Sequence, residues 1–524
     1  MKLRTIVKIA ITSSVVLLCS GFALYSFFRL SAAEGQKDFN LYELVPSTTS
    51  AVFVTDDVLE FVAEVDELTC SKNQQYLYVS KLFSYLKQSL YALSEDTPHG
   101  LSRQMNQMLI SFHEPDNERN QVLYCRLGNG DKELVNRFVR KYISSLYPPK
   151  TFIYKGEEII IYPMADGDFL ACYLASDFMA LSFQKKLIEN VIDAYKSGKS
   201  LADDSTFTGI RAPKKSAAAA TIYTRMQGMM GWTEFDMKMK DDFIYFSGIT
   251  HDADTCFAFI NQLRQQQSVK GFPGEVLPST AFYFSRQGIT DWVSLLSYGN
   301  VQRQSVPVRT SEVQNRDKEF SRYLMENAGQ DLVACLFQRE DTLQGAAAVL
   351  SLSVADVTEA ERMLRALVNA ASADEGRRNP RITFCYTADK AYPVYRLPQT
   401  TLFTQLSSFV EPASELYAAF YAGRLLLAPD EDSLSDYILR LDKGEVLDSA
   451  VTYKAGMSNL SDSYHFMLMA DFEHLFRQVE KQGCFVPDFF VRNAEFFRNF
   501  ILFAQFTCAD EVAYPTIVLK YKAD

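Results

Sequence analysis

Residues 170–207 read LACYLASDFMALSFQKKLIENVIDAYKSGKSLADDSTF, and residues 416–453 read LYAAFYAGRLLLAPDEDSLSDYILRLDKGEVLDSAVTY. The two stretches align without a gap, and the alignment extends to residues 230 and 476. Each contains an apolar run, a short turn, an amphipathic helical pattern, a glycine (Gly198 or Gly444) and a second apolar run. Few positions are identical, so it is the shared pattern that indicates an internal duplication.

The same features recur upstream of both stretches. Val45-Pro46-Ser47-Thr48 and Leu277-Pro278-Ser279-Thr280 each precede an apolar run, 232 positions apart, whereas the aligned stretches lie 246 positions apart. The second half therefore has extra residues, which we place in the polar stretch 300–318. We expect a cytoplasmic tip and transmembrane anchor (1–30), a linker (31–43), a first α+β repeat (44–270) and a second α+β repeat (271–524).

Local patterns predict the elements of each half. Ala51 to Thr55 is typical of a strand, and Asp56 suits the N-cap of a following helix. A second helical pattern covers 76–93, and 152–154 with 158–162 predicts an antiparallel hairpin. Three more strands are each followed by an acid that suits a helix start: Val122 to Leu127 with Asp131, Phe243 to Ile249 with Asp252 or Asp254, and Ala346 to Val354 with Asp356.

These patterns predict an α+β fold. We expect two tandem, pseudo-symmetric halves with mainly antiparallel sheets flanked by helices, after an N-terminal transmembrane helix. The closing apolar runs of the halves, 243–249 and 516–521, are expected to be late strands of their respective sheets.

The N-terminal segment predicts a membrane anchor. Ile9 to Phe28 is a run of twenty residues without a charge, enough for a helix to span the roughly 30 Å hydrocarbon layer. Cations precede this run, so the positive-inside rule puts the N-terminus in the cytoplasm and the body in the periplasm. We expect a single-pass protein of the inner membrane. The alternatives are secretion after signal cleavage near Ala33 and a lipoprotein linked at Cys19.

The chain resembles a family of single-pass bacterial envelope proteins known only as a domain of unknown function. The resemblance rests on the strand opening at Leu44 to Val54, on the block from Asp166 to Phe207, and on a less well preserved copy from Ala422 to Tyr453. It covers most of the body. It implies an envelope location and an α+β fold, and it offers no catalytic residues to carry over.

The composition is that of a globular protein. Of 524 residues, 48% are hydrophobic and 22% are charged, which excludes a disordered chain. The net charge is -11, and the charges of residues 1–30 are all positive, so the body is more acidic than the whole chain. An acidic body repels phosphate backbones, and we therefore expect no nucleic-acid partner.

Enzyme motifs are absent or incomplete. None of the five histidines has the spacing of a zinc hydrolase: His99, His113, His251, His465 and His474. Ser182 and Lys185 match the Ser-x-x-Lys pattern of penicillin-recognising acylases, but the companion motifs are missing and a capping role for Ser182 is favoured.

Two further patterns also favour structural roles. Gly198-Lys199-Ser200 ends like a phosphate-binding loop, but Asp193 occupies the place of its first glycine, so we expect Gly198 to be a helix C-cap. The acidic clusters 203–204, 241–242 and 430–432 lack the spacing of a calcium loop and are interpreted as helix starts and turns. The sequence predicts no catalytic, cofactor-binding or metal-ligating residue.

Eight cysteines follow the anchor. The predicted compartment is oxidising and permits disulfides, but Cys125, Cys172 and Cys385 lie inside apolar runs and no Cys-x-x-Cys occurs. We expect mostly buried free thiols with one or two bridges, and no redox catalysis.

Three functions are compatible with these features. The favoured one is a non-catalytic, membrane-anchored envelope protein that serves as an interaction or scaffold module for an envelope partner. The second is a small-molecule or glycan-binding protein that uses a cleft between the two halves. Trp232 and Trp292 in that groove would favour this function, and their burial in separate cores would weaken it. The third is an enzyme with an unrecognised carboxylate site.

Overall fold

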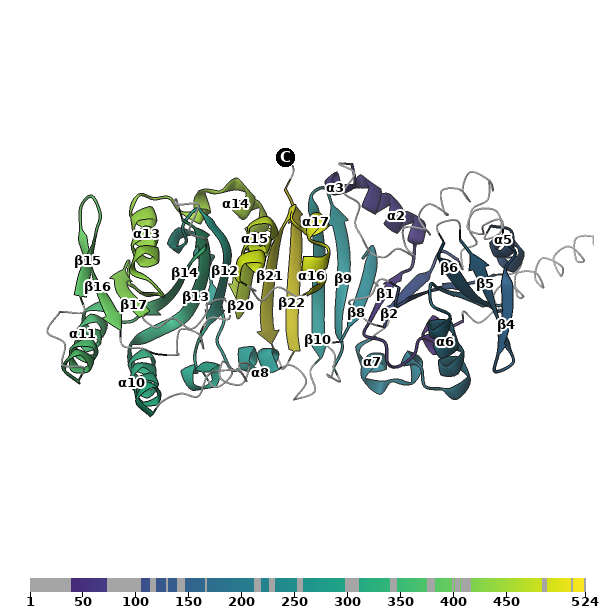
Figure 1. The fold of residues 1–524 in the computed structure, drawn as a ribbon, viewed down its shortest axis with the longest axis horizontal. Coiled ribbons are helices and arrows are strands. Elements are labelled where there is room, and N and C mark those ends of the chain that lie inside the picture. Colours follow the sequence, from purple (N-terminus) through teal and green to yellow (C-terminus); the bar gives the residue numbers. More distant parts are fainter. Residues whose placement is uncertain are drawn as a thin grey trace, which may run out of the picture.

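Twenty strands form one antiparallel sheet in the computed structural model, and helices cover both of its faces (Figure 1). The structure describes residues 39–72, 105–113, 119–128, 131–138, 147–164, 167–211, 218–225, 231–251, 258–296, 311–339, 346–374, 382–397, 400, 406, 416–482, 488–509 and 512–522. The fold is therefore a mixed α+β fold, as the sequence patterns predict.

The strand bounds follow the chain through each half. The first half (residues 39–270) contains β1 (Ala51–Thr55), β2 (Met108–Phe112), β3 (Gln121–Arg126), β4 (Lys150–Tyr154), β5 (Glu157–Pro163), β6 (Phe169–Leu174), β7 (Phe178–Ser182), β8 (Ala220–Thr224), β9 (Thr233–Lys240), β10 (Phe243–His251) and β11 (Val269–Lys270). The second half (residues 271–522) contains β12 (Ala281–Gly288), β13 (Ala328–Gln338), β14 (Ala346–Val354), β15 (Ile382–Tyr386), β16 (Ala391–Leu397), β17 (Leu416–Tyr421), β18 (Arg424–Ala428), β19 (Ser463–Tyr464), β20 (Phe466–Asp471), β21 (Phe500–Ala509) and β22 (Val512–Tyr521).

Helices and 3-10 turns connect these strands. Those of the first half are η1 (Leu41–Leu44), α2 (Val58–Glu67), α3 (Thr69–Lys72), α5 (Asp131–Phe138), α6 (Lys185–Ser197), η3 (Leu201–Asp203), α7 (Ser205–Ile210) and α8 (Ala258–Arg264). Those of the second half are η4 (Pro273–Val276), α10 (Ser311–Asn327), α11 (Val357–Asp374), α13 (Glu431–Asp442), η5 (Leu447–Ser449), α14 (Val451–Met457), α15 (Phe472–Gln482), α16 (Asp488–Arg492) and α17 (Ala494–Phe497).

The strand order is the same when read inward from either edge. One edge begins with the meander β4-β5-β6-β7, followed by β3-β2-β1 and then β8-β9-β10. The other begins with β15-β16-β17-β18, followed by β14-β13-β12 and then β20-β21-β22. The short strands β11 and β19 pair separately.

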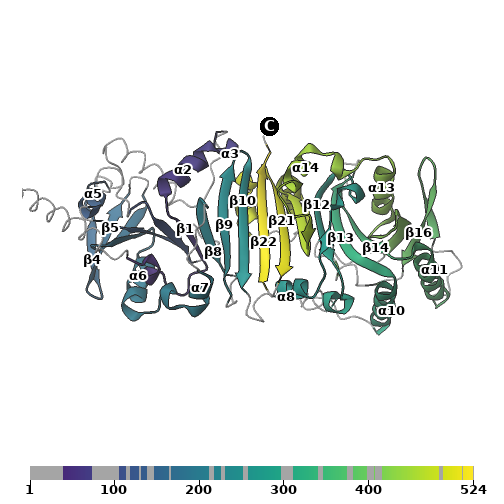
Figure 2. The same ribbon diagram turned by 180° about the vertical axis from the view of Figure 1, so that it is seen from behind.

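The two halves share a single sheet. β10 and β22 pair with each other at the centre of the molecule, from Phe243 opposite Lys520 to His251 opposite Val512 (Figures 1 and 2). The expectation of a separate sheet in each half is therefore wrong. On one side of β10 and of β22, the backbone N–H and C=O groups have no partner strand in their own half. The strand of the other half forms hydrogen bonds with them.

Four large apolar cores, and a small one formed by Ile260 and Ala513, hold the helices on the sheet in the described part of the chain. One lies under η1, α6 and α7 and includes Ile188, Phe207 and Trp232. A second lies under α13 and α14, and a third, which includes Trp292, lies under α10 and α11. The fourth contains Phe61 of α2 together with Phe472 of α15, so its residues come from both halves.

Local signals in the sequence explain many element boundaries. The strand at Ala51–Thr55 and the hairpin β4–β5 are confirmed, and the hairpin turn uses positive φ at Lys155 and Gly156. Asp356 accepts a hydrogen bond from the N–H of Glu359 at the start of α11. The cap of α2 is Asp57, which accepts from the N–H of Glu60, and the prediction of Asp56 is wrong by one residue.

Some predictions fall outside the described residues. These are the anchor at 9–28 with Cys19, cleavage near Ala33, the helix at 76–93, His99, and the caps at Asp252 or Asp254. Among the helices that the structure does describe, none is long and apolar enough to cross a membrane.

Candidate binding sites

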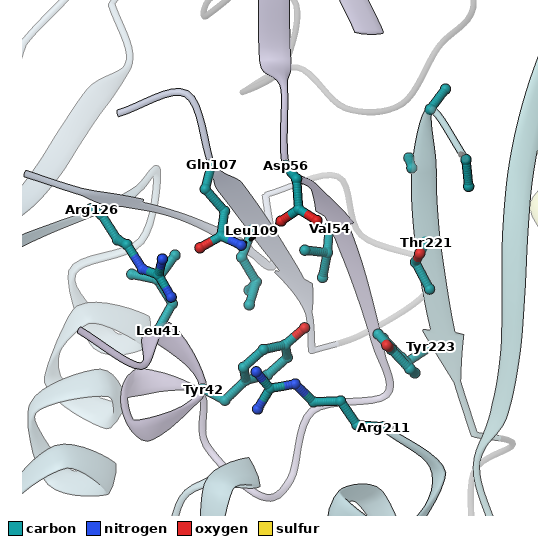
Figure 3. Close-up of a pocket in the computed structure, with 13 residues that line it drawn as sticks. Leu41, Tyr42, Val54, Asp56, Gln107, Leu109, Arg126, Arg211, Thr221 and Tyr223 are labelled. Atoms are coloured by element: carbon teal, nitrogen blue, oxygen red, sulfur yellow. Dashed lines mark hydrogen bonds between the residues drawn. The ribbon is translucent and has the colours of Figure 1, made fainter. Parts of the chain in front are cut away.

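A pocket of about 200 Å³ opens in the first half beside the end of β1 (Figure 3). Its polar lining consists of Tyr42, Asp56, Gln107, Arg126, Arg211 and Tyr223. Its remaining wall consists of Leu41, Val54, Leu109, Thr221 and Ala218 to Ala220. These residues come from η1, from β1, β2, β3 and β8 with the residues next to β1, β2 and β8, and from the end of α7, segments that are far apart in sequence and that the sheet brings together.

Tyr42 is fixed in the pocket from both sides. The 3-10 turn η1 begins after Asn40, whose side-chain oxygen accepts a hydrogen bond from the N–H of Tyr42 at 3.4 Å. Phe207 packs against the ring of Tyr42, with 5.2 Å between the ring centres. The guanidinium carbon of Arg211 lies 4.0 Å from the centre of the Tyr42 ring, within cation–π distance.

Two buried tyrosines, Tyr42 and Tyr223, line the pocket. Tyr42 is 7% exposed and Tyr223 is 6% exposed, and neither hydroxyl makes a hydrogen bond to another residue that the structure describes. Burial raises the pKa of Tyr42 well above its usual value, and burial raises the pKa of Tyr223 to about 12. Both phenols are therefore neutral at physiological pH and can donate a hydrogen bond to a ligand.

The charged groups of the pocket are predominantly positive. Arg126 donates from Nε to the carbonyl of Phe39 at 2.7 Å, and Asp56 accepts a hydrogen bond from the side-chain amide of Gln107. Arg211 lies exposed at the rim, and its guanidinium makes no ion pair with the residues that the structure describes. The lining thus contains two guanidinium groups, of Arg126 and Arg211, and the carboxylate of Asp56.

Motif searching could not find this pocket, because its residues follow no common spacing. One signal was present in the aligned stretches. Ala218 and its neighbours Ala219 and Ala220 stand where the second half has Tyr464 and larger side chains, 246 positions later. A small residue in one half that aligns with a large aromatic residue in the other half indicates a place where side chains fill the two halves differently.

The two ends of the sheet form a second candidate surface. β4 and β15 are the outermost strands, and each pairs on one side only within the described part of the chain. Phe152 and Ile153 of β4 are 40% and 71% exposed, and Phe384 and Tyr386 of β15 are 51% and 71% exposed. Edge strands usually carry charges or proline, so exposed apolar side chains at both ends favour contact with a partner.

An acidic group near the C-terminus is neutralised within the protein. Asp471, Glu473 and His474 lie close enough together to hold a metal ion. However, the ammonium of Lys522 lies 2.8 Å from Asp471 Oδ1 and 3.0 Å from Glu473 Oε2. Burial raises the pKa of Asp471, but hydrogen bonds from His474 and Lys522 outweigh it and the net pKa is lowered. Ionised carboxylates around an ammonium indicate a structural ion cluster.

The two patterns that partly match enzyme motifs have structural roles among the described residues. The N-cap of α6 is Gln184, so the prediction of Ser182 as the cap is wrong by two residues. Ser182 donates from Oγ to the carbonyl of Gln121 at 2.8 Å and accepts from the N–H of Gln184. Lys185 instead pairs with Glu189. Gly198 and Gly444 both have the positive φ of a helix end, as predicted.

The acidic clusters and histidines also serve the fold. Asp204 and Asp430 cap α7 and α13, and Asp242 binds Lys520 at 3.1 Å. Ser111 Oγ lies 2.9 Å from His113 Nε2, and His465 Nδ1 accepts from the N–H of Cys508. These contacts agree with the interpretation of caps, turns and structural histidines.

The six cysteines that the structure describes are free thiols: Cys70, Cys125, Cys172, Cys335, Cys385 and Cys508. Burial raises the pKa of Cys125 and of Cys172 to about 12, which keeps both thiols protonated and unreactive. Cys256 and Cys484 lie outside the described residues.

The tryptophans do not line a shared groove. Trp232 is buried in the core under α6 and α7, and Trp292 is buried in the core under α10 and α11. The pocket itself lies within the first half, whereas the halves meet through the β10–β22 ladder.

Comparisons of this chain with protein family models, with curated proteins and with solved structures give no significant match.

Proposed function

We propose that this chain is a non-catalytic, membrane-anchored envelope protein whose body is an interaction or scaffold module facing the periplasm. The observation that carries the proposal is the pair of apolar edge strands, β4 and β15, at the two ends of an elongated sheet (Figure 1). A partner that contacts one end leaves the other end accessible, so one molecule can hold two partners apart.

The edge strands offer two kinds of contact. The outer side of each has backbone N–H and C=O groups that an added strand can pair with, which is the chemistry of β-augmentation. Ile153 and Tyr386 supply apolar area next to those groups. Backbone pairing gives affinity, and the exposed side chains give preference for particular partners.

The body is proposed to consist of two copies of one α+β unit. The same loop contact occurs in each half: Leu201 donates to the carbonyl of Val45, and Leu447 donates to the carbonyl of Leu277, both at 2.8 Å. Isolated bridges join Pro46 with Ser200 and Pro278 with Val446 beside these contacts. The shared strand order of the halves supports the same origin.

The strand registers also locate the extra residues of the second copy. Val54 pairs with Leu109 and Thr221, and Arg286 pairs with Val333 and Met467, which makes Val54 and Arg286 equivalent. When the pairing is followed to the next strands of each half, Arg126 becomes equivalent to Ser353 and Phe178 to Arg424. The separation grows from 227 to 246 between these two pairs, which supports a position for the extra residues between β14 and β18 instead of at 300–318.

Photocrosslinking in intact cells tests the proposed function. A photoreactive phenylalanine analogue replaces Ile153 or Tyr386, and Val451 is the control, because it is 82% exposed but lies on α14 away from both edges. We expect discrete protein adducts from the two edge positions and none from Val451. Equal adducts at all three positions, or none at either edge, would contradict the proposal.

A further inference from the structure

The strands at the two ends of the sheet hold equal places in their halves. β4 begins the order β4-β5-β6-β7 from one edge, and β15 begins the order β15-β16-β17-β18 from the other. Each pairs on one side only within the described part of the chain, and Ile153 and Tyr386 expose apolar area there. At the centre of the molecule, β10 and β22 also hold equal places, and they pair with each other in antiparallel order. The molecule therefore already contains one ladder between strands of equal place.

The helices α6 and α13 lie on the same face of the sheet. Leu123 of β3 and Leu336 of β13 belong to the core that both halves share. Tyr124, the next residue of β3, belongs to the core under α6, and Cys335, the preceding residue of β13, belongs to the core under α13. Because neighbouring residues of a strand point to opposite faces, both helices lie on the face opposite the shared core.

Each of these helices also contacts the edge strand of its half. The ammonium of Lys185, in α6, lies 4.9 Å from the centre of the Phe152 ring of β4. Thr383 of β15 donates a hydrogen bond from Oγ1 to Glu431 of α13 at 2.6 Å. Phe152 and Thr383 thus point to the face that carries the two helices.

The two ends of the molecule carry opposite net charges. The β4 end, residues 150–158 and 185–199, contains six lysines and four acidic residues. The β15 end, residues 382–397 and 430–445, contains seven acidic residues and four basic ones. Two like ends would repel each other, whereas a β4 end attracts a β15 end.

We propose that each end of the sheet binds a second copy of this chain, with β4 of one molecule paired antiparallel with β15 of the next. The inference rests on the proposed function and identifies the partner of its edge contacts. Because the two contacting surfaces differ, every pair of joined copies keeps one free β4 and one free β15, and further copies can extend the sheet into a row.

The faces of the two strands restrict the register of this contact. Ile153 and Phe384 follow Phe152 and Thr383 in their strands, so both point away from the helices. Side chains directly opposite each other in an antiparallel ladder share a face. A ladder with Ile153 opposite Phe384 of the next copy therefore keeps both faces continuous. It places α6 of one copy and α13 of the next on the same face, on either side of the new ladder.

Disulfide trapping in cell membranes tests the inference with the full chain. Cells produce one form with Ile153→Cys and one with Phe384→Cys, each with its own affinity tag, and both positions are exposed, at 71% and 51%. Directly opposite residues have Cα atoms about 4.5–5.5 Å apart, within reach of a disulfide. After oxidation we expect at least about tenfold more dimer with both tags than dimer from either form alone. Val451→Cys in place of Ile153→Cys is the control and should give no mixed dimer.

The outcomes separate this inference from the proposed function. Equal amounts of dimer from Ile153→Cys alone would show that like ends meet and would overturn the inference. An absence of mixed dimer would also overturn it, and photocrosslinks from Ile153 to another protein would then leave the proposed function in place. An absence of both the disulfide and any photocrosslink would overturn the proposed function as well.

Charge reversal tests whether the two helices direct the contact. Lys185→Glu in the form with Ile153→Cys should lower the yield of mixed dimer roughly threefold, and Glu431→Lys in the other form should restore it. Lys454→Glu is the matched control, because that side chain is 61% exposed on α14, and it should leave the yield unchanged. An undiminished yield with Lys185→Glu would contradict the orientation that the charges select.

Discussion

Single residues decide where polar groups can be buried in this molecule. Burial raises the pKa of Asp331, but the charges of Arg424 and Arg286 outweigh it and the net pKa is lowered. The two guanidinium groups are buried in turn, with side chains 13% and 16% exposed. Removing one charge from such a group leaves the others buried without a partner. This destabilises a protein far more than replacing the whole group by apolar residues.

Asp331→Asn should therefore destabilise the protein strongly. The change leaves Arg286 and Arg424 without their shared carboxylate, and we expect a loss of about 3–5 kcal/mol in the free energy of unfolding. Urea unfolding followed by circular dichroism measures it. Asp432→Asn is the control, since that side chain is 78% exposed near Arg339 and should change stability little. Equal effects of the two substitutions would show that Asp331, Arg286 and Arg424 do not form a buried ion cluster.

His113 predicts a pH dependence of stability. Burial lowers the pKa of His113 to about 4, while an unfolded histidine titrates near 6.5. Between these values the unfolded chain binds a proton that the folded protein does not, so stability falls as pH decreases through this window. His113→Gln should flatten that dependence. Proton NMR of the histidine rings provides the check, and titration of all five near 6.5 would refute the expectation.

At the scale of elements, turns and caps are the part of the fold that the sequence predicts best. Gly198 has a φ of 62° at the end of α6, and a Cβ at this position would meet no residue beyond its chain neighbours within 4 Å. Gly209 lies within α7 and has equal space but no positive φ. The two glycines therefore differ in backbone conformation and not in packing.

Gly198→Ala should destabilise the protein by about 1 kcal/mol, because an L-residue is strained in the left-handed region. Gly209→Ala should be neutral or stabilising, since alanine favours helix. Thermal unfolding of the two variants compares them directly. A larger loss for Gly209→Ala than for Gly198→Ala would mean that the helix end is assigned incorrectly.

Elements whose signals are local could be predicted, and long-range pairing could not. β1, β14 and the β4–β5 hairpin follow from alternation and turn residues within a few positions. The β10–β22 ladder joins residues that are far apart in the chain, and each strand alone is equally consistent with a separate sheet. The pocket was missed for the same reason, because Tyr42, Arg126 and Arg211 meet only after the sheet has formed.

At the scale of the whole molecule, the proposed anchor and the elongated body can be separated experimentally. We expect the chain without residues 1–38 to remain folded and to leave the membrane fraction, because residues between Leu41 and Tyr521 build the described cores. Carbonate extraction of membranes from cells that express either form measures the partition. A truncated chain that stays with the membrane would contradict the proposed anchor. The intact mass of the full chain shows whether the anchor is retained or removed by cleavage near Ala33.

The pairing of β10 with β22 joins the two halves into one sheet, and this joining separates the two ends on which the proposed function depends. Hydrogen–deuterium exchange followed by mass spectrometry tests it most directly, through peptides from β10 and β22 at the centre and from β4 and β15 at the edges. We predict that the central strands exchange among the slowest in the protein and the edge strands much faster. Exchange of β10 and β22 at the rate of the edge strands would show that the halves are not joined.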